Sequence, residues 1–159
     1  MPAADNKQLT RRWFEEVWNQ GREATIDELA APNAVIHGLE DEGKDMSGPN
    51  EFRKFYRLIR SGLSDIHVTV GQVIGEGDLT AVQFTLRATH AGDGLGVKAT
   101  GRRVTASAIV MARWKDGKIV EAWNEFDAAG LMRQISAGAG GGPAPAAAGA
   151  GAARPKVKA

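Results

Sequence analysis

Cysteine is absent from the 159-residue sequence. Its absence excludes disulfide bonds, a thiol nucleophile and a metal site built from thiolates. The chain also lacks a large excess of positive or negative charge, because 20 basic and 19 acidic residues leave a net charge of +1. Nucleic-acid-binding proteins usually carry a concentrated basic patch, whereas the only basic bias here is the sparse set Arg154, Lys156 and Lys158. We therefore expect no nucleic-acid partner.

Long hydrophobic runs are also missing. No segment approaches the roughly 18 consecutive apolar residues of a membrane-spanning helix. The N-terminal residues are polar where a secretory signal peptide would be apolar. We therefore expect a soluble, cytoplasmic protein with no membrane partner.

Large apolar residues become scarce after Ser136, where Ala, Gly and Pro dominate. Such a segment cannot bury enough surface to offset the conformational entropy that is lost on folding. The sequence before it is long enough for one domain with its own core. We therefore predict one folded domain over residues 1–136 and a disordered tail over residues 137–159.

Apolar residues repeat with a helical period in the N-terminal part of the chain. Residues 6–20 carry one such stripe. A second helix is predicted to begin at Thr25, whose hydroxyl would form a capping box with Glu28. A third is predicted to begin at Gly48-Pro49, because proline is tolerated at the first helical position.

The period then changes from 3.6 to two. Strands are predicted over Ile66–Val70, Leu79–Ala91 and Arg102–Trp114, and Asp116-Gly117 predicts a tight hairpin turn. Three helices followed by an antiparallel meander indicate the α+β class. The economical arrangement is a cone-shaped roll, in which a curved antiparallel sheet wraps its concave face around the three N-terminal helices.

The hairpin turn sets the register of the last two strands. If Lys115 pairs with Lys118, an unbroken ladder places Asp127 opposite Ala106, with Trp123 and Glu125 on the same face. The pattern does not decide which face is inside, and a β-bulge would shift the register. Small residues such as Ala106 favour this face as the wall of a cavity.

Asp127 is the candidate catalytic residue. A carboxylate in an apolar cavity has its pKa raised by desolvation, toward the range that suits a general acid or base. The alternative is that Asp127 caps a helix that begins at Ala128, since Asp is a favoured N-cap. The two roles are compatible.

Further candidates for contacts with a substrate are aromatic or polar residues near the predicted cavity, although core packing also explains the aromatic ones. They are Trp123, His37, His90, Tyr56, Trp18, Phe52 and Glu125. The three histidines of the chain are far apart in sequence, without the short spacing typical of metal ligands, so we expect no metal site.

Four segments carry a resemblance to a known family: Arg87–Gly92, Ala99–Val104, Asp116–Trp123 and Asp127–Gln134. Together they resemble the SnoaL-like polyketide cyclases, over about residues 6–135. The resemblance implies the cystatin-like, nuclear-transport-factor-2-like cone with an apolar cavity and no cofactor. It also implies intramolecular aldol cyclisation of a polyketide, with Asp127 at the position of the family's acid/base.

The leading hypothesis is therefore a cofactor-independent acid/base enzyme that acts on a hydrophobic small molecule. A hydrolase or isomerase on the same cone is an alternative, although epoxide hydrolysis needs a second Asp where this chain has Thr89. A non-catalytic binding or assembly module is the third. A shielded Asp127 would favour catalysis, and an exposed one the module.

The opposite sheet face carries Ile109, Met111 and Phe126 in the unbroken register. Exposed apolar residues of this kind require a cover. We therefore expect a homodimer through the outer face of the sheet.

Overall fold

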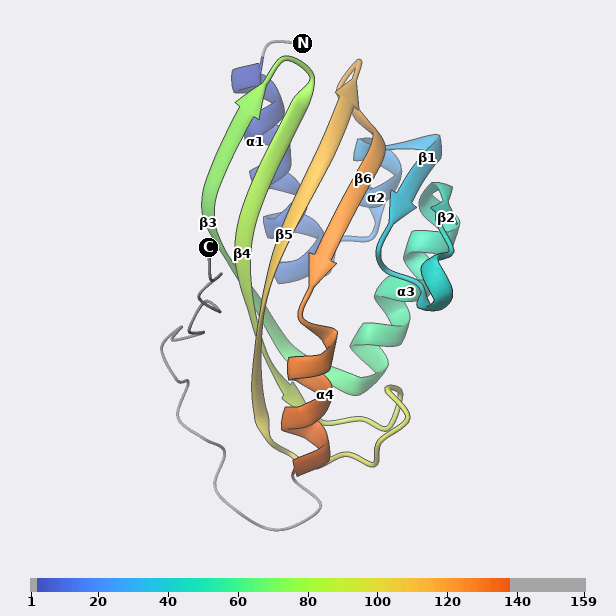
Figure 1. The fold of residues 1–159 in the computed structure, drawn as a ribbon, viewed down its shortest axis with the longest axis vertical. Helices are drawn as coiled ribbons and strands as arrows, with labels where there is room; N and C mark the ends of the chain where they lie inside the picture. The colour runs from blue at the N-terminus through green and yellow to red at the C-terminus, as the bar shows by residue number, and fades with distance from the viewer. Residues whose placement is uncertain (1–2, 138–159) are drawn as a thin grey trace, which may run out of the picture.

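A computed structural model of the chain describes residues 3–137 (Figure 1). The predicted disordered tail falls almost wholly on residues 138–159, outside this range. The chain forms helices and one curved sheet: all three predicted helices come before the antiparallel meander, as expected, and two strands come before the third of these helices. Helix α1 spans Ala3–Trp13, α2 spans Ala24–Leu29, α3 spans Gly48–Gly62 and α4 spans Ala128–Ser136. The predicted α+β cone is confirmed.

The strands form one six-stranded sheet in the order β2-β1-β6-β5-β4-β3. They are β1 (Ala30–His37), β2 (Met46–Ser47), β3 (Leu63–Glu76), β4 (Leu79–His90), β5 (Arg103–Lys115) and β6 (Lys118–Phe126). The meander from β3 to β6 is antiparallel, but β1 pairs with β6 in parallel, so the sheet is mixed and not wholly antiparallel as predicted. Figure 1 shows α1, α2 and α3 covering one face of this sheet.

The first predicted helix continues past α1 as a π-helical turn over Phe14–Asn19. A π-helix bonds residues five apart, and the Gln20 N–H donates accordingly to the Glu15 carbonyl at 2.9 Å. This wider turn keeps Phe14 and Val17 together in the core.

The capping box predicted at Thr25 is wrong. Glu23 is the N-cap of α2 and makes no side-chain cap bond, while Thr25 lies inside the helix. The Thr25 hydroxyl donates to Glu16, and Glu28 forms ion pairs with Arg12 and Arg22. The two arginines therefore take the carboxylate that the capping box would have used.

The tight hairpin between β5 and β6 is confirmed. Lys115 pairs with Lys118, and both turn residues have positive φ, 51° at Asp116 and 75° at Gly117. Such angles define the two-residue turn that an Asp-Gly dipeptide favours.

A β-bulge follows this turn and overturns the predicted register. Trp114 pairs with Ile119 and Arg113 pairs with Glu121, so Val120 is an extra residue in β6. From there on the pairing is shifted by one residue. The concave face consequently receives Asn124 and Phe126, and the convex face receives Trp123 and Glu125. The pairs with β5 are Val110 with Asn124, Met111 with Trp123, Ile109 with Glu125 and Ala108 with Phe126.

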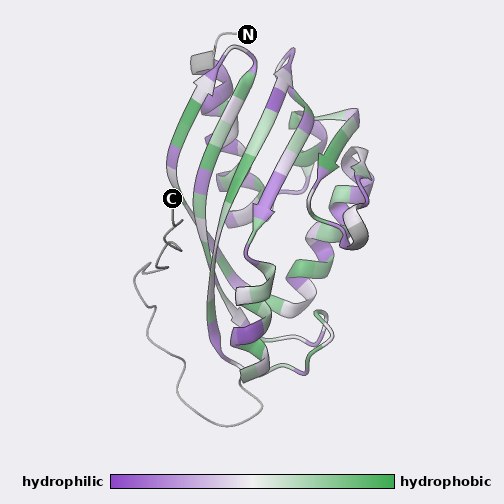
Figure 2. Cartoon of the chain, viewed as in Figure 1, coloured by the Kyte–Doolittle hydropathy of each residue, from purple (hydrophilic) through white to green (hydrophobic). Residues whose placement is uncertain are grey.

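Alternation of hydrophobic and hydrophilic residues along the long strands fixes the two faces (Figure 2). On β4 the concave side is buried, as at Val82 and Leu86, while Gln83 and Arg87 on the convex side are exposed. The core therefore lies between the concave face and the helices.

Helix α4 docks against β5 beyond the end of β6. Its N-cap is Asp127, whose carboxylate accepts the Gly130 N–H at 2.9 Å. The Gln134 carboxamide accepts the Thr105 N–H at 2.9 Å and donates to the Thr105 carbonyl at 2.7 Å. Gln134 thus supplies the pair of hydrogen bonds that a neighbouring strand would otherwise give to Thr105.

Candidate functional site

A cavity of about 100 Å³ lies between the concave face and the helices. Aromatic rings from the helices and strands form much of its wall: Trp13, Phe14, Trp18, Phe52, Phe84 and Phe126. Pockets for drug-sized ligands usually have roughly 300–1,000 Å³, whereas an apolar cavity of about 150 Å³ binds benzene. In this conformation the cavity therefore suits a guest of one small ring, and a larger guest requires the rings to move.

The wall of the cavity is almost wholly apolar. Within residues 3–137, no titratable side chain lines it, and apart from the indoles the polar side chains are those of Thr10 and Asn124. The Thr10 hydroxyl donates to the Asn6 carbonyl at 2.8 Å and lies 3.0 Å from the Thr80 hydroxyl. Trp114 Nε1 donates to Thr80 at 2.9 Å. A hydrogen-bond chain therefore links Asn6, Thr10, Thr80 and Trp114 at this end, although Asn6 Oδ1 is buried with no partner among residues 3–137.

Two of the predicted substrate contacts, Trp18 and Phe52, line the cavity. Tyr56 does not: it is 2% exposed and its hydroxyl donates to the Val17 carbonyl at 3.1 Å. Tyr56 is therefore a core residue whose polar group is satisfied within the protein.

His90 is fully buried at the end of β4 and joins two of the segments that carry the family resemblance. Its Nδ1 lies 3.0 Å from the Thr100 hydroxyl and accepts the Thr100 N–H at 3.3 Å. Because an amide N–H can only donate, Nδ1 carries the lone pair and Nε2 the proton. His90 Nε2 is buried with no partner among residues 3–137. His90 ties down the loop that leads to β5, and it does not line the cavity.

Trp123, His37 and Glu125 lie outside the cavity. Trp123 and Glu125 pair with Met111 and Ile109 on the convex face because of the bulge. The expectation that Trp123 flanks a ligand inside the cone is therefore wrong, because Trp123 lies on the convex face.

Asp127 is exposed and absent from the cavity wall. The expectation that its carboxylate points into an apolar cavity is wrong. The bulge places Phe126 on the concave face, so the next residue, Asp127, lies on the convex side. Its cap bond to Gly130 confirms the alternative interpretation. A Cβ at Gly130 would come within 2.1 Å of Asp127 Oδ2, so glycine leaves the space that the cap needs. Its role as an acid or base stays a prediction.

A second, shallower hollow surrounds Asp127 on the convex face. Glu125, Ser107, Gln83 and Ile109 contribute to it. Both carboxylates of this hollow, Glu125 and Asp127, are exposed.

Asn124 is absent from the residues predicted as substrate contacts, because the unbroken register places it on the other face. The structure puts it in the cavity wall, where its Nδ2 donates to the His37 carbonyl at 2.9 Å. Only the possibility of a bulge, noted from the sequence, pointed to this inversion.

His37 forms a charged cluster on the convex side. Its Nδ1 lies 2.7 Å from Asp45 and its Nε2 lies 2.9 Å from Glu121. The ring stacks on Trp123 with centroids 5.6 Å apart. Hydrogen bonds to Glu121 and then to Asp45 raise the pKa of His37. With a carboxylate at each nitrogen, the imidazolium form satisfies both contacts.

No three His, Asp or Glu side chains within residues 3–137 come together in a way that could hold a metal ion. In the same part of the chain, no helix is long and apolar enough to cross a membrane.

The chain matches the SnoaL-like polyketide cyclase family over residues 8–135. Aklanonic acid methyl ester cyclase DnrD from Streptomyces peucetius is 26% identical over 128 residues, which cover 80% of this chain and 88% of that relative. A solved structure from Jannaschia sp. CCS1, named as a SnoaL-like polyketide cyclase, gives a TM-score of 0.76 at 25% identity and covers 86% of this chain and 96% of its own.

AclR from Streptomyces galilaeus, named as a hydroxylase, gives a TM-score of 0.75 at 26% identity, with 85% of this chain and 87% of its own covered. The fold is thus the nuclear-transport-factor-2-like cone, and the chain belongs to the SnoaL-like polyketide cyclase family. Relatives named as a cyclase and as a hydroxylase share this cone, so membership alone does not fix the reaction.

The His37 cluster predicts a pH dependence of stability. A raised folded-state pKa means that the cluster stabilises the fold fully below the unfolded pKa, near 6.5, and loses this contribution as pH rises through the folded pKa. We compare the wild type with His37→Phe, which keeps the ring stack. The difference in unfolding free energy, measured in urea, should be larger at about pH 5.5 than at about pH 9, by less than about 1 kcal/mol because the pairs are partly exposed.

An equal difference at both pH values would contradict this prediction. Glu15→Gln is the control, and its unfolding free energy should differ from that of the wild type by the same amount at both pH values. Its carboxylate lies on the π-helical turn, where it accepts hydrogen bonds from Asn19 and Gln20.

Proposed function

We propose that this chain encloses a small apolar molecule in the cavity of the cone. The observation that carries the proposal is the composition of the cavity wall, which is apolar and has no titratable side chain within residues 3–137. Such a wall binds a guest by excluding water from both surfaces, without a specific charge.

The size of the cavity sets the expected affinity. A one-ring guest that buries about 150 Å² of apolar surface gains about 4 kcal/mol. That free energy corresponds to a Kd of about 1 mM. Single-ring hydrocarbons such as p-xylene are therefore suitable probes.

Filling the cavity tests this proposal. Ala112 lines the wall and Ala81 lies on the other face of the neighbouring strand, opposite Met111. Ala112→Leu should weaken p-xylene binding at least about tenfold because it occupies the guest's space, at a cost of about 1–3 kcal/mol in stability. Ala81→Leu, the matched control, should bind as the wild type does. Binding is measured by ligand-detected NMR.

Equal p-xylene affinity in Ala112→Leu, Ala81→Leu and the wild type would show that the probe binds elsewhere. Absence of binding to the wild type would contradict the proposal directly.

A second candidate function is acid/base ring closure of a polyketide-type substrate by Asp127. The similarity to aklanonic acid methyl ester cyclase DnrD supports it. In this reaction a carboxylate removes a C–H proton next to a carbonyl, the carbanion attacks a second carbonyl, and the carboxylic acid returns the proton to the new alkoxide. The substrate would have to reach the exposed end of β6, where the carboxylate now accepts the Gly130 N–H.

Substitution of Asp127 separates the two candidates. Asp127→Asn keeps an equally good N-cap and should leave stability unchanged, whereas Asp127→Ala should cost about 1 kcal/mol. Under either function Asp127→Asn should hold p-xylene as tightly as the wild type, because Asp127 lies outside the cavity wall. If ring closure is the function, the same variant should lose turnover of aklanonic acid methyl ester, followed by chromatography.

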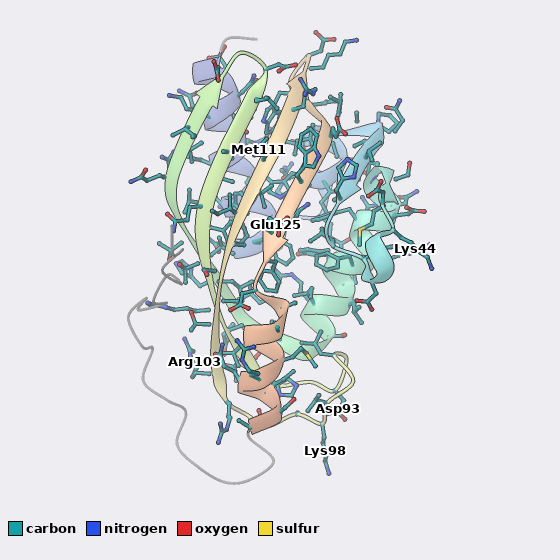
Figure 3. All side chains as sticks on the ribbon, in the orientation of Figure 1. Lys44, Asp93, Lys98, Arg103, Met111 and Glu125 are labelled. Atoms are coloured by element: carbon teal, nitrogen blue, oxygen red, sulfur yellow. The ribbon has the colours of Figure 1, made fainter. Side chains whose placement is uncertain are left out.

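We also propose a homodimer through the convex face of the sheet. Ile109 and Met111 are 53% and 41% exposed there; Met111 and Glu125 are labelled in Figure 3. Phe126 is no longer part of this surface, because it lines the cavity. The dimer should give twice the chain mass in light scattering, and Met111→Lys should shift it toward monomer. A wild-type monomer at high concentration would contradict the proposal.

A further inference from the structure

Among residues 3–137, Asn124 is the one amide side chain in the wall of the cavity. We infer that it is the specificity-determining residue of this site, and that the preferred guest is an apolar ring that carries a hydroxyl group. This inference rests on the proposed binding function and names the class of guest.

The orientation of the Asn124 carboxamide is fixed by its partner. A carbonyl oxygen only accepts hydrogen bonds, so the group that meets the His37 carbonyl at 2.9 Å must be the NH₂ group. The oxygen therefore stands at the other end of the carboxamide. Within residues 3–137 the side chain of Asn124 makes this one hydrogen bond, so a residue of the cavity wall carries an acceptor that is not engaged.

The backbone around this contact is tightly held. A Cβ at Gly38 would lie 2.2 Å from the Asn124 carbonyl oxygen, and Gly38 has a φ of +84°. Only glycine allows this close approach. The start of the loop after β1 is thus pressed against β6 at Asn124. The carboxamide is pre-organised, and a guest does not have to order it.

Two other polar side chains of the wall, Thr10 and Trp114, are already occupied. The Thr10 hydrogen goes to the Asn6 carbonyl and its oxygen meets the Thr80 hydroxyl. The Trp114 N–H goes to Thr80. An unengaged acceptor favours a guest with a donor, and a phenol or an enol supplies one on an otherwise apolar ring. A guest whose only polar groups are carbonyl oxygens has no hydrogen to donate, so it gains no hydrogen bond from Asn124 Oδ1.

The test uses p-cresol and p-xylene, which have the same shape and differ in one hydroxyl. In Asn124→Leu, affinity for p-cresol should fall about tenfold, the worth of one hydrogen bond, while affinity for p-xylene stays within about twofold. Thr10→Val is the matched control at another polar residue of the wall, and it should preserve the preference. Affinities are measured by NMR titration.

A measurement on the wild type makes the result independent of whether Asn124→Leu folds. The side-chain NH₂ resonances of Asn124 should shift more on addition of p-cresol than on addition of p-xylene, because both rings perturb nearby protons but only the phenol donates to the carboxamide. Equal shifts with both probes, or no shift with either, would overturn the inference.

The outcomes also separate this inference from the function on which it rests. If p-xylene binds and Asn124→Leu weakens both probes equally or neither, the proposed binding function stands and the role of Asn124 falls. If Thr10→Val alone removes the preference, the anchor is Thr10 and the inference is wrong. If neither probe binds to the wild type, both proposals fail together.

Discussion

A single extra residue in β6 determines the chemical character of both faces of this sheet. Val120 has no partner in β5, so every later residue of β6 faces the side opposite to the one an unbroken ladder would give it. The concave face then receives Asn124 and Phe126. The convex face receives Glu125, and Asp127 follows it there. Since burial of an unpaired carboxylate costs several kcal/mol, the bulge is what makes an apolar interior compatible with this sequence.

The end of the domain shows how one motif can serve architecture as well as chemistry. Asp127 caps α4, Gly130 leaves room for the carboxylate, and Gln134 completes the hydrogen bonds of Thr105. The three contacts hold the helix against β5 where β6 has ended. These residues belong to the segment that most resembles the cyclases, and each of them has a structural role in holding α4.

The family relationship and the geometry constrain function in different ways. Similarity over residues 8–135 establishes the cone and the kind of protein. The cavity wall decides what the cone can hold, and here it offers apolar surface, one amide and no titratable group within the described range. A cluster of charged side chains around His37 and Glu121 lies instead on the convex side. A reaction that needs a carboxylate would therefore take place outside the cavity.

Local signals in the sequence determined much of the fold. The helical stripe before residue 20, the proline at the start of α3 and the Asp-Gly turn each report on neighbouring residues, and all three elements form as predicted. The parallel pairing of β1 with β6, the bulge at Val120 and hence the placement of Asn124 were decided by the tertiary structure. Each depends on how residues distant in sequence pack. The alternation of residues along a strand does not by itself show which of its two faces is buried.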